Sequence, residues 1–314
     1  MNKLILYSII ATLILIALII LYNTRKKEKS KILILSFIYS ILLETAIMPL
    51  RGYVNFQTSL LVGFFMFFAL TYYLASKYSD RVNPTYIFLI LLLGIFLLLA
   101  PPHFFFFKKT LVSLPDVFFR FIGIITGYLF FNLKTKKRWL VFVVTSVICF
   151  FMFARGYDMW LNKLNFGTFT ETVTEEEIPN DFLLTDSLGS EIKINDLQGK
   201  VVILDFWNSR CGVCFSKFPQ VQSTYDKYKQ NPDIFFCSVN YFLEDDKDGD
   251  AFRIIKEQGY SFPVLICKDK LLLKNLGIQV YPTVIVINKE GKLIFRGNIE
   301  TADKSIGEIL SKAM

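Results

Sequence analysis

Long apolar stretches fill the first half of this 314-residue chain and constrain its fold more than any other feature. A helix needs about 20 apolar residues to cross a bilayer, where its backbone polar groups must all be hydrogen-bonded within the segment. The sequence therefore predicts an α-helical transmembrane bundle over residues 1–155, in contact with the lipid bilayer. It predicts about six spans, at residues 3–22, 32–50, 58–76, 85–102, 117–133 and 139–154.

The basic residues predict how this bundle is oriented. Residues 1–174 carry a net charge of +12 and residues 175–314 a net charge of −4. The loops after the first, third and fifth spans hold eleven Lys and Arg residues, whereas the N-terminus and the other loops between spans hold four. By the positive-inside rule the basic loops are cytoplasmic, so the N-terminus and everything after the sixth span lie outside. The basic charge thus belongs to membrane-flanking loops and does not predict nucleic-acid binding.

Three charged residues lie within or beside the predicted spans. Asp116 and Arg120 are four residues apart, so on a helix they share a face and are able to pair. Glu44 has no such neighbour along the chain. A charged side chain is costly in lipid, so Glu44 either pairs with a cation inside the bundle or serves a transport or catalytic role. The sequence leaves both readings open.

The second half of the chain has the pattern of a soluble α/β domain. Residues 156–177 form a predicted linker, since residues 168–177 are polar and lack periodicity. From residue 178 to residue 314, strands alternate with helices and a hairpin and helix close the domain, which predicts a three-layer α/β fold. Strands are expected at residues 182–185, 191–194, 201–206, 233–240, 262–267, 283–288 and 292–296, and helices at 212–229, 251–258, 271–276 and 302–313.

A cysteine pair follows the most apolar of these strands. Residues 201–207 read Val-Val-Ile-Leu-Asp-Phe-Trp, and Cys211-Gly212-Val213-Cys214 then opens a helix. A helix N-terminus stabilises anions, so the first thiol is expected to ionise readily, and two cysteines three apart can form and break a disulfide. The chain has five cysteines, one histidine and a single Cys-x-x-Cys, which favours redox chemistry over metal binding. No metal site is therefore predicted. Cys237 and Cys267 are expected to be buried, inert thiols, with a disulfide between them as the alternative.

Several motifs around this pair occur in the same order as in a known family. They are Phe206-Trp207, the two cysteines, Pro219 eight residues after Cys211, and the loop Gly277-Ile278-Gln279-Val280-Tyr281-Pro282-Thr283. Residues 178–314 thereby resemble the thioredoxin superfamily, and within it the TlpA/ResA-like thiol–disulfide oxidoreductases held at the outer face of bacterial membranes. The resemblance includes none of the predicted spans.

The chemistry and the resemblance assign roles to the two cysteines and to one acid. Cys211, at the helix start, is expected to attack as a thiolate, and Cys214 to resolve the mixed disulfide. Asp205, six residues before Cys211, stands where thioredoxins keep a buried acid that shuttles protons to the second cysteine. Burial is expected to raise the pKa of this carboxyl and suit it to general acid–base work. The alternative is that Asp205 merely caps the loop after the strand.

Further residues are candidates for substrate binding. The resemblance implies that Pro282 is cis and that Tyr281 and Pro282 lie where an extended substrate strand pairs with the loop. Trp207 is expected to pack beneath the site, with substrate contact as the alternative. Arg210 replaces the tryptophan that many relatives carry before the first cysteine, and this cation is expected to lower the pKa of the Cys211 thiol and to favour acidic partners. Lys217 replaces an acid found in some relatives, so the acid–base role falls to Asp205.

These features predict a membrane-tethered, extracytoplasmic thiol–disulfide oxidoreductase of a bacterial cytoplasmic membrane. A reductase acting on exported proteins is favoured over an oxidase, with the Cys211–Cys214 disulfide as its redox centre and no other cofactor. Cys149 is the one cysteine in the predicted spans. Dithiol relay across the membrane needs a pair, so a separate membrane electron donor or acceptor is implied. The alternative is a membrane transporter or sensor that uses the thioredoxin-like domain for docking or redox sensing, because six spans exceed what an anchor requires.

Overall fold

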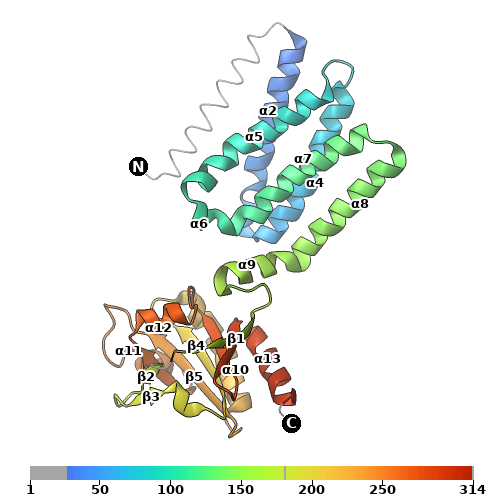
Figure 1. Ribbon diagram of the computed structural model, residues 1–314. Helices are drawn as coiled ribbons and strands as arrows, with labels where there is room; N and C mark the ends of the chain where they lie inside the picture. Colours follow the sequence, from blue (N-terminus) through green and yellow to red (C-terminus); the bar gives the residue numbers. More distant parts are fainter. Residues whose placement is uncertain (1–26, 180–181, 313–314) are drawn as a thin grey trace. The chain divides into compact units, whose positions relative to one another are not determined.

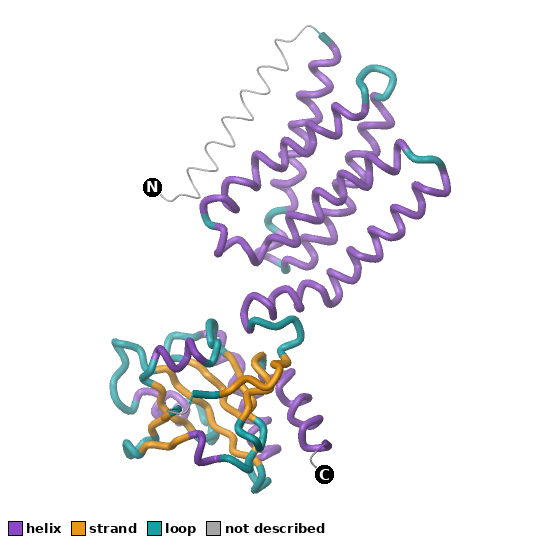
Figure 2. The backbone as a smooth tube through the Cα atoms, viewed as in Figure 1, coloured by secondary structure: helices purple, strands orange, loops and turns teal. Residues whose placement is uncertain are grey.

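The computed structural model describes residues 27–179 and 182–312 (Figures 1 and 2). The chain divides into two compact units, one up to Asp158 and one from Met159 onward. Each unit has its own buried core. The first predicted span, residues 3–22, lies outside the described residues.

The first unit is a bundle of long apolar helices. Within the described residues, five helical segments are long and apolar enough to cross a membrane, and they coincide with the second to sixth predicted spans. In Figure 1, α4 and α7 run side by side and make the most extensive helix–helix contact of the bundle. Its helices are α2 (Glu28–Ile47), α3 (Leu50–Tyr53), α4 (Phe56–Tyr78), α5 (Pro84–Phe105), α6 (Phe107–Thr110), α7 (Leu114–Asn132) and α8 (Thr135–Phe151), and α9 (Tyr157–Phe166) begins in this unit and continues into the second.

Glycines on α7 explain how closely α4 and α7 pack. A Cβ atom at Gly123 would lie 2.4 Å from the carbonyl oxygen of Phe64, and one at Gly127 would lie 2.6 Å from that of Phe68. Neither position therefore has room for a side chain. Small residues allow helix backbones to approach in a membrane, where dispersion contacts hold helices together because lipid is as apolar as the helix surfaces.

Two helices extend beyond their predicted ends. Helix α5 passes through Pro101 and Pro102 and ends at Phe105, three residues after the predicted stop. A proline removes its own donor but leaves its carbonyl, and the Phe106 amide donates to the Pro102 carbonyl at 2.9 Å to close the last turn. The final span, predicted to end at residue 154, continues through a π-helical turn (Met152–Gly156) into α9.

The charged residues of the bundle form one buried ion network. The Arg120 guanidinium donates to both Glu44 and Asp116 and, at 3.0 Å, to the Ser59 hydroxyl. Arg51 donates to Asp116 at 2.5 Å and to Glu44 at 3.1 Å. Glu44, Asp116 and Arg120 are fully buried. The expected Asp116–Arg120 pair is confirmed, and Glu44 pairs with two cations contributed by other helices. Two carboxylates thus face two guanidiniums, which offsets the cost of burying each charge alone.

The second unit is built around one eight-stranded mixed sheet. Its strand order is β1-β8-β7-β4-β5-β6-β2-β3. The central strand β4 pairs parallel to β5 and antiparallel to β7. The strands are β1 (Thr172–Glu177), β2 (Leu183–Thr185), β3 (Glu191–Lys193), β4 (Val201–Trp207), β5 (Ile234–Tyr241), β6 (Val264–Cys267), β7 (Thr283–Ile287) and β8 (Lys292–Gly297).

Helices cover both faces of this sheet. Helices α10 (Gly212–Tyr228), α11 (Asp250–Glu257) and α13 (Ile299–Lys312) pack on the face that carries Ile203 and Trp207. Helix α12 (Lys270–Asn275) packs on the opposite face, against Leu204 and Val239. The predicted three-layer α/β arrangement is therefore present. Every residue of β4 is buried, which is why its sequence is apolar at every position except Asp205 instead of alternating.

The predicted linker over residues 156–177 is wrong in part, because it contains structure. Helix α9 occupies its beginning, and β1 occupies its end as an antiparallel edge strand beside β8. Only Val173 in β1 is buried, so the strand has no hydrophobic alternation to detect. Backbone pairing and a 2.6 Å contact between Arg296 and Glu176 hold it instead. The ordered domain accordingly begins before residue 178.

Candidate active site

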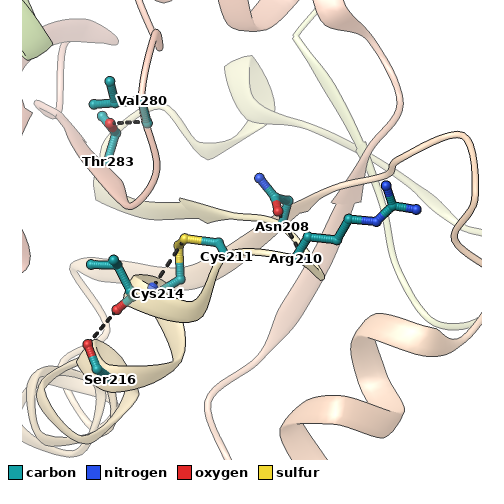
Figure 3. Close-up of a disulfide and its surroundings, with 8 residues drawn as sticks. Asn208, Arg210, Cys211, Cys214, Ser216, Val280 and Thr283 are labelled. Carbon is teal, nitrogen blue, oxygen red and sulfur yellow. Dashed lines mark hydrogen bonds between the residues drawn. A yellow bond between two sulfur atoms is a disulfide. The ribbon is translucent and has the colours of Figure 1, made fainter. Parts of the chain in front are cut away.

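The strand–turn–helix unit places the cysteine pair at one end of the sheet. Strand β4 ends at Trp207, three residues follow, and Cys211 is the N-cap of α10. Cys211 and Cys214 form a disulfide with their Cα atoms 5.2 Å apart (Figure 3). The Cys214 amide donates to the Cys211 sulfur at 3.2 Å. Helix α10 then continues without a break through Pro219.

The two sulfurs differ in exposure. Cys211 is half-buried, whereas Cys214 is 1% exposed. An incoming disulfide therefore reaches Cys211 first. The amide at the start of α10 and the dipole of this 17-residue helix both favour a thiolate at that position. The geometry suits Cys211 as the attacking sulfur and Cys214 as the resolving one.

The loop between α12 and β7 lies beside the disulfide, as Figure 3 shows for Val280 and Thr283. The Tyr281–Pro282 peptide bond is cis, as the resemblance implied. The Thr283 hydroxyl donates to the Val280 carbonyl at 2.7 Å and closes the turn. Tyr281 is partly buried and stacks on Tyr241, with ring centroids 6.3 Å apart. Burial of its hydroxyl raises the Tyr281 pKa, so this side chain stays neutral.

Asp205 lies on β4 behind the disulfide and is 1% exposed. Burial, and secondarily the negative charge of Glu300, raise the pKa of the Asp205 carboxyl to about 7. A carboxyl with that pKa takes up and releases a proton near neutral pH, which is what general acid–base work requires. The expected raised pKa is thus present, and burial is its main cause. Capping of the loop does not explain Asp205, since its Oδ1 has no hydrogen-bond partner among the described residues.

Trp207 and Arg210 were both candidates for substrate contact. Trp207 is fully buried and packs against Phe215 and Phe218, which agrees with the expected packing role and not with the alternative of substrate contact. Arg210 is exposed, but it pairs with Asp245. Its charge is therefore shared with that carboxylate instead of facing the Cys211 thiol alone.

The acidic loop at residues 244–250 is a part of the site that the sequence did not reveal. Besides the Arg210–Asp245 pair, Asp246 accepts a hydrogen bond from the Ser209 hydroxyl at 2.5 Å. Two consecutive residues before the cysteine pair are therefore attached to this loop. The sequence shows only that residues 244–250 are rich in acids and that Arg210 is a cation. It does not specify that these residues contact one another.

A second missed contact joins α10 to α13. Lys217 pairs with Glu300, and Glu300 also faces Asp205 closely enough to raise its pKa. The position where some relatives carry an acid thus holds Lys217, and its ion-pair partner Glu300 lies 83 residues further along the chain. The remaining thiols, Cys237 and Cys267, are free and buried, as expected. Burial raises the pKa of both, to about 11 for Cys267, which makes them inert.

A sheet of this order, with a Cys-x-x-Cys disulfide at a helix N-terminus facing a cis-proline loop, defines a thioredoxin-like domain. Residues 173–310 match the family model described as Redoxin, so the C-terminal half of the chain contains a Redoxin domain. That match begins inside β1, in agreement with the earlier domain start.

The relatives of this chain are thiol–disulfide oxidoreductases. It is 29% identical over 160 residues to the thiol-disulfide oxidoreductase ResA of Bacillus subtilis, covering 51% of this chain and 85% of that protein. It is also 29% identical to ResA of Halalkalibacterium halodurans over 162 residues, covering 51% of this chain and 86% of that one. Among solved structures, StoA from Bacillus subtilis matches with 27% identity and a TM-score of 0.33, over 39% of this chain and 93% of that chain.

Proposed function

We propose that this chain is a membrane-tethered thiol–disulfide oxidoreductase whose C-terminal domain reduces disulfides of exported proteins outside a bacterial cytoplasmic membrane. The observation that carries the proposal is the Cys211–Cys214 disulfide at the start of α10, with one sulfur half-buried and the other fully buried. Asp205, on the sheet face that α10 covers, is the proposed proton acceptor, because its pKa is raised to about 7. The five apolar helices of the first unit support the membrane tether, and the distribution of Lys and Arg supports the orientation.

The reaction follows from this geometry. The Cys211 thiolate attacks a substrate disulfide, forms a mixed disulfide with one substrate sulfur and displaces the other as a thiolate, which takes a proton from water. The Cys214 thiol gives its proton to Asp205 and attacks the Cys211 sulfur. The second substrate sulfur leaves as a thiolate and takes a proton from water, so two electrons have passed to the substrate and the Cys211–Cys214 disulfide has formed. A separate membrane donor must then supply two electrons and two protons to restore the dithiol.

Substrate binding is proposed to use the loop at Tyr281 and Pro282 as a backbone partner for an extended segment. The exposed Arg210–Asp245 pair lies at the rim, where a charged substrate side chain can compete for either member. No cofactor besides the disulfide enters the proposed reaction.

The test is the reduction potential of the full chain in detergent, measured against glutathione or dithiothreitol buffers. A potential near or below about −270 mV supports a reductase, and one near about −120 mV an oxidase. If no reversible two-electron couple appears, the proposal fails and the sensor or docking alternative takes its place. The Cys211→Ser variant provides the matched comparison, because an enzyme loses all turnover while a docking module keeps its partner.

A further inference from the structure

Four buried polar atoms cluster on the sheet face beneath α10. They are Asp205 Oδ1, Trp207 Nε1, Ser238 Oγ and Asn240 Nδ2, and none has a hydrogen-bond partner within the described part of the chain. Each of the four residues is at most 1% exposed. A buried polar atom without a partner is costly, and native proteins satisfy such groups with ordered water where side chains do not.

The register of the sheet places these residues in a two-by-two block. Strands β4 and β5 are parallel neighbours, with Asp205 opposite Ser238 and Trp207 opposite Asn240. Neighbouring strands lie about 4.8 Å apart, and alternate residues of a strand share one face. The remaining residues of that face, among them Ile203 and Phe236, are apolar. The polar block is therefore a local interruption of the hydrophobic core on the sheet face that α10 covers.

One corner of this block borders a surface pocket. Asn240 lines a pocket of about 270 Å³ at the carboxyl ends of β5 and β6. The pocket is bounded by the turn between β2 and β3, by Phe242 and Phe252, and by Lys268. Asp246 also lines this pocket and accepts a hydrogen bond from the Ser209 hydroxyl. The pocket therefore adjoins the segment that leads to the cysteine pair.

The proposed reaction requires such a route. In each cycle Asp205 accepts the proton of Cys214 and must later release it, yet Asp205 has almost no exposed surface. We infer that ordered water held by Ser238, Trp207 and Asn240 carries this proton from Asp205 to the pocket at the carboxyl ends of β5 and β6. The Ser238 hydroxyl accepts and donates in the relay, and the Asn240 amide orients its outer end. Both are positioning residues. The inference rests on the proposed function.

Other charged groups face Asp205 and define the competing route. Glu300 of α13, paired with Lys217 of α10, lies on the helix side of the sheet. The two cysteines lie at the start of α10, whereas Cys237, on β5, belongs to the core on the opposite face of the sheet. The Lys217–Glu300 pair is exposed, with 37% and 43% of the side chains accessible, so a proton leaving on that side would bypass Ser238 and Asn240.

The experiment separates attack from resolution in the reduced full chain in detergent, using 5,5′-dithiobis(2-nitrobenzoate) in stopped flow. Attack by Cys211 releases the first thionitrobenzoate anion, and attack by Cys214 releases the second. The variant Asn240→Leu keeps the side-chain size but removes the polar end of the row. We expect its second phase to be slower by at least about ten-fold near neutral pH, with an increased solvent isotope effect and an unchanged first phase. Ser238→Ala should do the same.

Matched variants exclude a structural explanation. Asn240→Ser retains a polar group and is expected to keep the rate of the second phase, with the same reduction potential as the unaltered chain. The inference is overturned if Asn240→Leu and Ser238→Ala both leave the second phase unchanged, or if Glu300→Gln slows it instead. If the unaltered chain shows no second phase at all, the proposed function itself has failed, and that result is distinct from the others.

Discussion

Replacing Asp205 by asparagine is expected to remove a pH-dependent loss of stability from the folded, oxidised domain. Burial raises the pKa of this carboxyl from its ordinary 3.8 to about 7. A raised pKa means that the folded state binds the proton more tightly than the unfolded state does. The group therefore contributes stability that is fully present below about pH 3.8 and is lost as the pH rises through about 7.

The magnitude follows from the size of the shift. A change of about three pKa units corresponds to about 4 kcal/mol between the two protonation states. Roughly 3 kcal/mol of this change falls between about pH 4.5 and about pH 8, given the ordinary and raised pKa values. Asparagine does not titrate and resembles the protonated carboxyl in shape. The Asp205→Asn variant should therefore gain stability relative to the unaltered domain by roughly 3 kcal/mol across that interval.

The assay is urea unfolding of residues 159–314, which form one compact unit. Tryptophan fluorescence monitors the unfolding at about pH 4.5 and at about pH 8. Asp186 provides the control, because backbone hydrogen bonds, that of Ser190 first, lower its pKa. The Asp186→Asn variant should show no gain at the higher pH. An Asp205→Asn difference that is the same at both pH values would show that this carboxyl titrates near its ordinary value. The assignment of Asp205 as proton acceptor would then be refuted.

The remaining predictions concern the disulfide and the bundle. Cys214→Ser should trap a mixed disulfide with substrate that non-reducing gels detect, and a variant that still turns over would contradict its resolving role. Glu44→Gln should lower the melting temperature in detergent by an amount equivalent to about 3–5 kcal/mol, because it leaves buried cations without a partner. Glu28→Gln, from an exposed pair, should change the melting temperature little. Equal effects would mean that the buried network does not stabilise the bundle. Gly123→Ala should destabilise the bundle and Gly52→Ala should not, because a Cβ has room only at Gly52; the same melting assay decides.

Much of the local structure could be read from the sequence, because the signals for it are local. The second to sixth apolar stretches correspond to helices, and the strands and helices of the soluble half lie within a few residues of their predicted limits. The apolar run before Cys211 leads into a helix that begins at Gly212. Backbone hydrogen bonds within a helix, and burial of a continuous apolar strand, depend on residues close together in the chain.

The sequence could not reveal polar contacts between distant segments. The edge strand β1 is polar throughout except for Val173, so its partner β8 stabilises it through the backbone and leaves no pattern. The same holds for Lys217 and Glu300, for the acidic loop bound to Ser209, and for the two arginines that neutralise Glu44.

The sequence by itself determined the long apolar helices, the order of strands and helices, and the cysteine pair at a helix start. Only the tertiary structure decided which of these groups are buried and what faces them. That decision sets the chemistry, because burial raises the pKa of Asp205 and leaves Cys211 the more accessible of the two cysteines. It also aligns Ser238 and Asn240 with Asp205 and Trp207, since pairing between β4 and β5 brings together residues 33 positions apart.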